Sequence, residues 1–143
     1  MDIDIQVRGY EYSLDIALTN RSAESITIYT HSLPWVGWDS MMLIAAKTDA
    51  VGTIIGKNTP IDDPGVDRIT IKQNETLTGK ISLVDKFPGF MEAIKDRDVI
   101  VFWSYQIQPI DKPPLSRMGG FVLFPKLLMK HKIVHNIKQS PSS

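Results

Sequence analysis

The chain of 143 residues contains no cysteine. This absence excludes disulfide frameworks, thiol catalysis and zinc sites built on cysteine thiolates. A chain of this length does not need such crosslinks, because it buries roughly two thirds of its unfolded surface on folding. The sequence therefore predicts one domain that is held together by a hydrophobic core.

The chain also lacks net charge, since sixteen basic residues balance sixteen acidic ones. This balance creates no overall field that attracts polyanions, so we expect no nucleic-acid partner. The N-terminal residues do not show the basic segment and apolar run of a signal peptide. The apolar runs, such as residues 99–103, are too short for a bilayer, so we expect no membrane insertion. These absences predict a cytoplasmic protein, or a periplasmic one if a signal peptide has been removed.

Motifs for catalysis and nucleotide binding are missing as well. The sequence has no G-x-S-x-G nucleophile elbow and no glycine-rich phosphate-binding motif. His131 and His135 are spaced like two zinc ligands on one helix face. However, Lys132 stands where the zinc-peptidase pattern needs a glutamate, and the sequence suggests no third ligand. We therefore interpret both histidines as solvent-exposed residues.

The densest acidic cluster consists of Asp62, Asp63 and Asp67. Calcium-binding loops need several regularly spaced carboxylates, and here Pro64 directly follows the acidic pair. The cluster is therefore predicted to be a solvated turn. From these absences together we expect no metal, no cofactor and no enzymatic activity.

The sequence is rich in alternating apolar and polar residues, which predicts half-buried strands. Such runs occupy residues 3–7, 12–18, 25–30, 68–72 and 76–83, and shorter strands are expected at 51–56 and 119–125. The strongest strand signal is 98–107, because it is rich in β-branched and aromatic residues. The apolar run 41–46 predicts either a strand buried on both faces or a short helical piece.

The connections between these runs are short and polar. Residues 20–24 form a polar turn between two runs, which predicts an antiparallel hairpin. Residues 73–75 predict a tight turn, and residues 87–96 have room for one or two helical turns. The spacing predicts an all-β, immunoglobulin-like antiparallel β-sandwich of seven to nine strands with at most short helices.

The composition changes near the C-terminus. After Pro125 the chain contains four lysines and no acidic residue up to Lys138. We therefore assign residues 1–125 to the sandwich and residues 126–143 to a basic C-terminal tail. The tail also contains apolar residues such as Met129 and Ile133, so a short helix that docks on the body remains open.

Two segments resemble parts of known immunoglobulin-like domains. They are residues 18–28 (LTNRSAESITI) and 69–79 (ITIKQNETLTG), each a strand–turn–strand unit. These units are similar to those of bacterial intracellular proteinase inhibitors and of deuterolysin-type propeptides, although Gln73-Asn74 replaces the usual Pro-Gly. The resemblance implies the sandwich fold and an inhibitor-like role. Since no inhibitory-loop motif matches, it assigns no contact residue.

Candidate binding residues lie in two loops. Trp35 and Trp38 belong to the loop 31–40, and tryptophan is enriched at binding hot spots. We expect Trp35 to pack against the body and Trp38 to be more exposed and to contact a partner. Arg117 and Met118 form a second candidate contact surface, because the end loops of a sandwich carry most of its binding functions.

These features predict a non-catalytic domain that engages a protein partner through its end loops, such as an inhibitor or an immunity-type protein. Two alternatives remain open. One is an enzyme whose site is assembled from scattered residues, such as Asp62, Asp63 and His31. The other is a structural or assembly subunit that uses its sheet edges.

Overall fold

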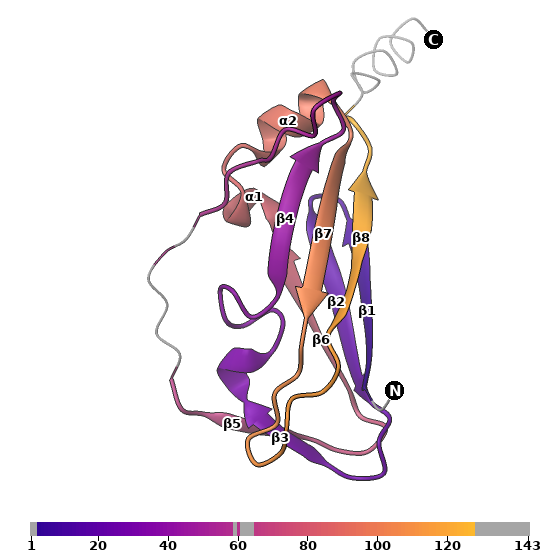
Figure 1. The fold of residues 1–143 in the computed structure, drawn as a ribbon, viewed down its shortest axis with the longest axis vertical. Coiled ribbons are helices and arrows are strands. Elements are labelled where there is room, and N and C mark those ends of the chain that lie inside the picture. The colour runs from indigo at the N-terminus through magenta and orange to yellow at the C-terminus, as the bar shows by residue number, and fades with distance from the viewer. Residues whose placement is uncertain (1–2, 59, 61–64, 128–143) are drawn as a thin grey trace, which may run out of the picture.

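The structure is a computed structural model that describes residues 3–58, 60 and 65–127. Its described residues form eight strands, two short α-helices and one 3-10 turn (Figure 1). The strands are β1 (Ile3–Tyr10), β2 (Ser13–Asn20), β3 (Ile26–Tyr29), β4 (Met42–Lys47), β5 (Arg68–Ile71), β6 (Thr76–Ser82), β7 (Val99–Tyr105) and β8 (Met118–Phe124). The helices are α1 (Leu83–Lys86) and α2 (Phe90–Asp96), and the 3-10 turn η1 is Thr30–Ser32.

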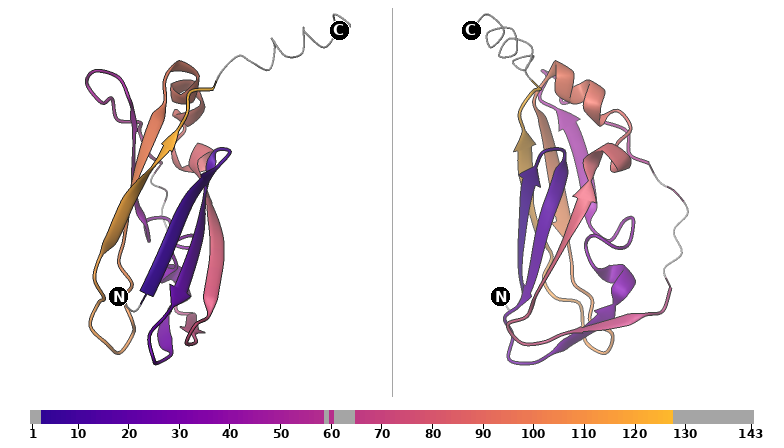
Figure 2. Two further views of the ribbon diagram at one scale, coloured as in Figure 1. Left: turned by 90° about the vertical axis from the view of Figure 1, so that its right-hand side faces the viewer. Right: turned by 180° about the vertical axis from the view of Figure 1, so that it is seen from behind.

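Two three-stranded antiparallel sheets form the layers of the sandwich. One sheet has the order β1-β2-β6 and the other has the order β4-β7-β8. The two layers are seen edge-on in the left view of Figure 2. This distribution corresponds to strands A, B and E facing strands C, F and G of an immunoglobulin-like sandwich. The predicted fold class is confirmed, including the number of strands and the short helices.

The predicted hairpin between β2 and β3 is wrong, because β2 pairs with β1 and β6, whereas β3 pairs with β5. The buried side chain of Asn20 occupies the break between β2 and β3. Its amide nitrogen donates to the carbonyl oxygens of Glu24 and Ile71, each at 2.9 Å. Its Oδ1 accepts from the backbone nitrogen and the hydroxyl of Ser22. These bonds satisfy the polar groups at the break, so the chain continues into a second ladder instead of turning back.

The tight turn predicted at residues 73–75 is confirmed. Asn74 adopts a positive φ of 64°, and the backbone nitrogen of Glu75 donates to the carbonyl oxygen of Lys72 at 3.0 Å. This turn joins β5 to β6 next to the break at Asn20, since the nitrogen of Asn74 donates to the oxygen of Asn20. The segment that contains β2 and β3 therefore pairs with the segment that contains β5 and β6. The ladder β2-β6 comes first, and the ladder β3-β5 follows beyond the break at Asn20.

The core lies between the two sheets and contains alternate residues of each strand. The predicted alternation of β7 is confirmed, because Val99 and Val101 are fully buried while Phe102 is exposed. Tyr105 closes the core at the end opposite the α-helices, where its hydroxyl donates to the carbonyl oxygen of Ser32 at 2.7 Å. Burial raises the pKa of the Tyr105 phenol well above its usual value, so this hydroxyl keeps its proton.

The α-helices close the other end of the sandwich. The helix predicted within residues 87–96 is confirmed as α2, whereas α1 begins at Leu83, where the sequence predicted the end of a strand. Phe90 of α2 is fully buried, and its ring meets those of Tyr12 and Phe124 edge-on at centroid distances of 6.2 and 5.7 Å. The helix therefore connects both sheets.

The chain stays attached to the body just beyond Pro125. The backbone nitrogen of Lys126 donates to Oδ1 of Asp98 at 2.6 Å, and that of Leu127 donates to the oxygen of Ile94 at 2.7 Å. Residues 128–143, which include His131 and His135, lie outside the described residues. Within the described ranges, none of the helices has the length and apolar character needed to cross a membrane.

Candidate functional site

The outward side of β4 is exposed, which corrects the sequence analysis. The run 41–46 predicted either a strand buried on both faces or a short helical piece. It is a strand, and burial alternates from Met42 to Ala45, while Ala46 on the outer side is buried. Leu43 and Ala45 face the core, whereas Met42 and Ile44 are about half exposed. The sheet β4-β7-β8 forms the outside of the sandwich here, as the left view of Figure 2 shows. A strand that is apolar on both faces therefore presents one of them to the surroundings.

The neighbouring strands continue this exposed surface, because residues paired across a sheet share a face. Three cross-strand rows result, and we call them together the apolar face. The first row is Ile54, Ala46, Ile100 and Leu123, the second is Ile44, Phe102 and Phe121, and the third is Met42, Ser104 and Gly119. All nine outward positions of the three strands are uncharged.

The apolar face is large enough to act as an interaction surface. Six of its side chains are between 45% and 64% exposed: Met42, Ile44, Ile54, Phe102, Phe121 and Leu123. At about half exposure they present roughly 600 Å² of apolar surface, taking about 200 Å² for a large bare side chain. The largest exposed apolar patch of a monomeric protein is typically about 300–600 Å² and is often functional, so the apolar face lies at the upper end of that range. The rings of Phe102 and Phe121 lie at the centre of the face, 6.4 Å apart.

One end of the apolar face is bounded by a projecting turn, residues 48–53, which we call the lip. The chain leaves β4, turns and returns so that Ile55 donates to the oxygen of Ala45 at 2.8 Å. Asp49 fixes the turn, because its carboxylate accepts from the backbone nitrogen and the hydroxyl of Thr53 at 2.9 and 2.6 Å. These bonds, led by the one from the Thr53 hydroxyl, lower the pKa of Asp49. The lip stands out on the outer side of the sheet (Figure 2, left).

Arg117 bounds the other end of the apolar face, where the sequence placed a candidate contact. Its guanidinium donates to the Ser104 hydroxyl at 3.0 Å and to Oε1 of Gln106 at 3.3 Å. It borders a polar hollow of about 440 Å³ that His31 and Asp39 also line. Asp39 is paired there with Lys57 at 2.8 Å, as in many surface ion pairs. The second predicted contact residue, Met118, is half-buried and packs against the core.

The loop that contains both tryptophans covers the edge of the opposite sheet. The prediction that Trp35 packs against the body is confirmed, because its ring lies on the backbone of Gly79 in β6 and contacts the core. Gly79 is required there, since a side chain at this position would overlap the ring. Trp35 is therefore a structural residue that fills the space beside β6.

Trp38 is half-buried and makes three contacts, with Asn58 and Lys86. Its indole nitrogen donates to the carbonyl oxygen of Asn58 at 2.7 Å. Lys86 places its ammonium 3.7 Å from the ring centroid and donates to the backbone oxygen of Trp38. Such a cation–π contact holds the ring in place. The expectation that Trp38 contacts a partner stays a prediction.

Some of the acidic residues considered for a catalytic or metal site are not among the described residues. Asp62 and Asp63, which one alternative combined with His31 in a catalytic site, lie outside the described residues. Among the residues that are described, no three histidine or acidic side chains gather closely enough to hold a metal ion.

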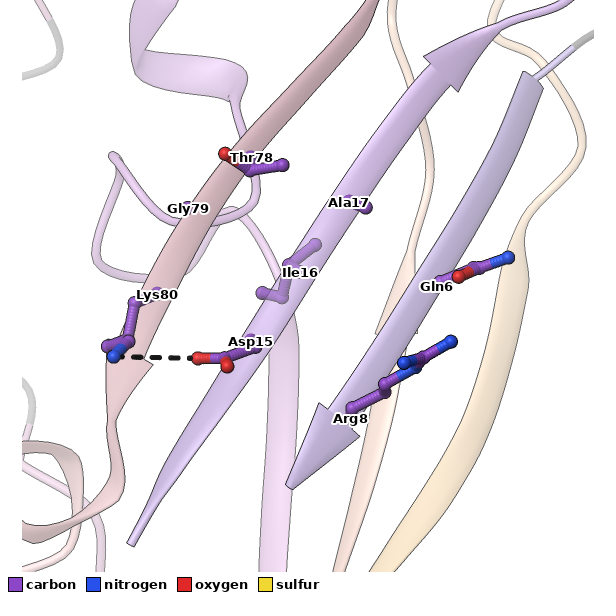
Figure 3. Close-up of a pocket in the computed structure, with 8 residues that line it drawn as sticks. All are labelled: Gln6, Arg8, Asp15, Ile16, Ala17, Thr78, Gly79 and Lys80. Carbon is purple, nitrogen blue, oxygen red and sulfur yellow. Dashed lines mark ion pairs between the residues drawn. The ribbon is translucent and has the colours of Figure 1, made fainter. Parts of the chain in front are cut away.

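The outward side of β1-β2-β6, which we call the polar face, has a different composition. Its outward positions are Asp4, Gln6, Arg8, Tyr10, Ser13, Asp15, Ala17, Thr19, Thr76, Thr78, Lys80 and Ser82. A hollow of about 550 Å³ lies over Ala17 and Gly79 (Figure 3). Of the charged side chains that line it, Lys80 lies 3.7 Å from Asp15 and 5.6 Å from the ring centroid of Tyr10. This face is therefore typical of a solvated sheet surface.

Comparison of the chain with known protein families finds no match, and a search among curated proteins finds none either.

Proposed function

We propose that this protein is a non-catalytic protein-interaction domain that binds through the apolar face. The observation that carries the proposal is the central row Ile44, Phe102 and Phe121, which is exposed on a sheet with no charged outward position. Aromatic side chains at the centre of a patch and charges at its rim are the usual composition of protein interfaces. The proposal keeps the protein partner that the sequence predicts and moves the contact from the end loops to the sheet.

The end loops contribute to the rim of this surface. Arg117 stands at one end and the lip stands at the other, so the sequence-predicted contact at Arg117 remains part of the proposed site. The inhibitor or immunity-type role that the resemblance implies would be one form of such a function. The proposed function rests on the surface chemistry and does not depend on that resemblance.

Site-specific photo-cross-linking tests the proposal. A photoreactive phenylalanine analogue replaces Phe121 on the apolar face or, as a matched control, Thr78 on the polar face. Both positions are exposed and outward-facing. In an extract of the source organism, the analogue at position 121 is expected to give a discrete protein adduct, either with a second copy of this chain or with another protein. Adducts at 121 that are no stronger than those at 78 would contradict the proposal.

A further inference from the structure

We propose that the occupant of the apolar face is a second copy of this chain. The two copies are related by a two-fold axis, and the strands of the two facing sheets run in opposite directions. This inference rests on the proposed function and names its partner. Three properties of the face carry it: its lack of charge, its shape and the charges at its two ends.

The lack of charge makes the apolar face compatible with itself. In a two-fold dimer the same patch lies on both sides of the interface, so any charge near the axis would approach its own copy. The outward positions of β4, β7 and β8 are all uncharged, and the aromatic pair Phe102 and Phe121 would lie at the axis. The exposed area of roughly 600 Å² per copy approaches the roughly 800 Å² per partner of stable complexes, before the lip is counted.

The shape of the face selects the antiparallel arrangement. The lip projects beyond the sheet at one end (Figure 2, left). It contains the exposed residue Val51, which lies in the turn where the backbone nitrogen of Gly52 donates to the oxygen of Asp49. The row at the other end is shallow, because two of its three outward residues are Ser104 and Gly119. When the strands run in opposite directions, each lip lies over the shallow row of the other copy. A parallel arrangement would instead bring the two projecting lips together.

The charges at the two ends complement one another in the same arrangement. Arg117 lies at the shallow row, where its guanidinium contacts the Ser104 hydroxyl at 3.0 Å and Sδ of Met42 at 3.8 Å, and Asp49 stands in the lip. The antiparallel arrangement brings Arg117 of one copy toward Asp49 of the other. The two-fold axis generates this pair twice, once at each end of the interface. Both side chains already have partners within their own copy, which hold them in position, and hydrogen bonds to charged groups are the stronger ones.

Sedimentation equilibrium of the purified full chain is the experiment that tests this inference. Between about 1 and 200 µM, the range in which an interface of this size associates, we expect a concentration-dependent dimer. Phe121→Asp is expected to weaken dimerisation by about 100-fold or more, because each copy would bury a carboxylate. Ile44→Lys is a second variant on another strand, so a folding defect in one variant does not decide the test. Thr78→Asp, on the polar face, is the matched control and should dimerise like the native chain.

A charge exchange tests the orientation. Arg117→Asp and Asp49→Arg are each expected to weaken the dimer by about tenfold, and the double variant is expected to recover most of this loss. Asp49→Asn keeps an acceptor for Thr53 and so separates the loss of charge from a change in the turn. Failure of the double variant to recover would overturn the antiparallel arrangement.

The remaining outcomes distinguish this inference from the proposed function. A native chain that is monomeric at about 200 µM, or a dimer that Phe121→Asp leaves intact, would overturn the inference. If position 121 then cross-links to a different protein, the proposed function stands and its partner is another chain. If deletion of residues 128–143 converts a monomer into a dimer, the occupant is the chain's own C-terminal segment, which also overturns the inference.

Discussion

The outer faces of the two sheets differ in chemistry, although their inner faces are built alike. Both sheets bury alternate aliphatic residues in the same core, such as Ile16 of β2 and Val101 of β7. Outward, β2 presents Asp15 and Thr19 to solvent, whereas β7 presents Phe102. The fold needs one apolar side per sheet, and the polar face shows that a charged outer side is compatible with it. This difference supports the proposed association through the apolar face.

The largest expected effect concerns the two sides of β7. Val101→Asp should unfold the domain, because an unpaired carboxylate at a fully buried position costs several kcal/mol. Phe102→Asp, one residue further and outward, should change the free energy of unfolding of the isolated copy by only about 1 kcal/mol. Urea unfolding followed by tryptophan fluorescence measures both, at concentrations where the chain is monomeric. A Val101→Asp variant that folds cooperatively would show that Val101 does not lie on the buried side of β7.

A smaller effect is expected at two glycines that each face a tryptophan on the inner side of a sheet. Gly79→Ala should destabilise the domain by about 2 kcal/mol, because the new methyl group would overlap the Trp35 ring. Gly120→Ala should cost about 1 kcal/mol or less, since its methyl group would lie 3.1 Å from Nε1 of Trp103. Thermal unfolding ranks the two variants. The reverse order would mean that Trp103, not Trp35, is the more tightly held ring.

The C-terminal segment provides a test of whether the apolar face is open. A chain that ends at Leu127 should bind a hydrophobic fluorescent dye as the full chain does and should melt at the same temperature. A chain that ends at Pro125 should melt about 5 °C lower, because it loses the contacts of Lys126 and Leu127 with the body. Stronger dye binding after the shorter deletion would indicate that residues 128–143 cover the apolar face.

The smallest effect is expected on the polar face. Asp15→Asn removes the exposed ion pair with Lys80, whose atoms are 3.7 Å apart, and should change the free energy of unfolding by less than about 0.5 kcal/mol. It should also leave the sedimentation behaviour unchanged. A loss of dimerisation in Asp15→Asn would show that association uses the polar face and would reverse the comparison between the two faces.

Much of the fold could be predicted because local alternation determines which side of a strand is buried. The strand at 98–107 and its inner residues Val99 and Val101 were predicted in this way. The pairing of the strands could not be predicted in this way, because it depends on contacts between residues that are distant in the sequence. The bonds of Asn20 with Ile71, 51 positions apart, are one example, and a polar turn at 20–24 looks the same in a hairpin and in a ladder break.

The candidate site was missed for a related reason. Sequence reasoning located binding residues by type, and so it favoured the tryptophans, of which Trp35 proved to pack against the core. A usable signal was present in the strands. Runs 41–46 and 99–103 are apolar at both odd and even positions, yet the α-helices of the described residues, α1 and α2, have only four and seven residues. Apolar residues on both sides of a sheet without a covering layer indicate an exposed interface.

The double-sided apolar character of β7 also has a consequence for folding kinetics. Its partner β8 follows after a loop of residues 106–117, but its other partner β4 ends more than 50 positions earlier. Pairing across such a separation is slow, because the loop must close before the contacts form. During that interval β7 is an unpaired, uncharged and strongly β-prone segment, which is the type that aggregates most readily. The yield of refolding should therefore fall steeply with protein concentration, and charges placed at Phe102 should relieve this loss even when the native chain is monomeric.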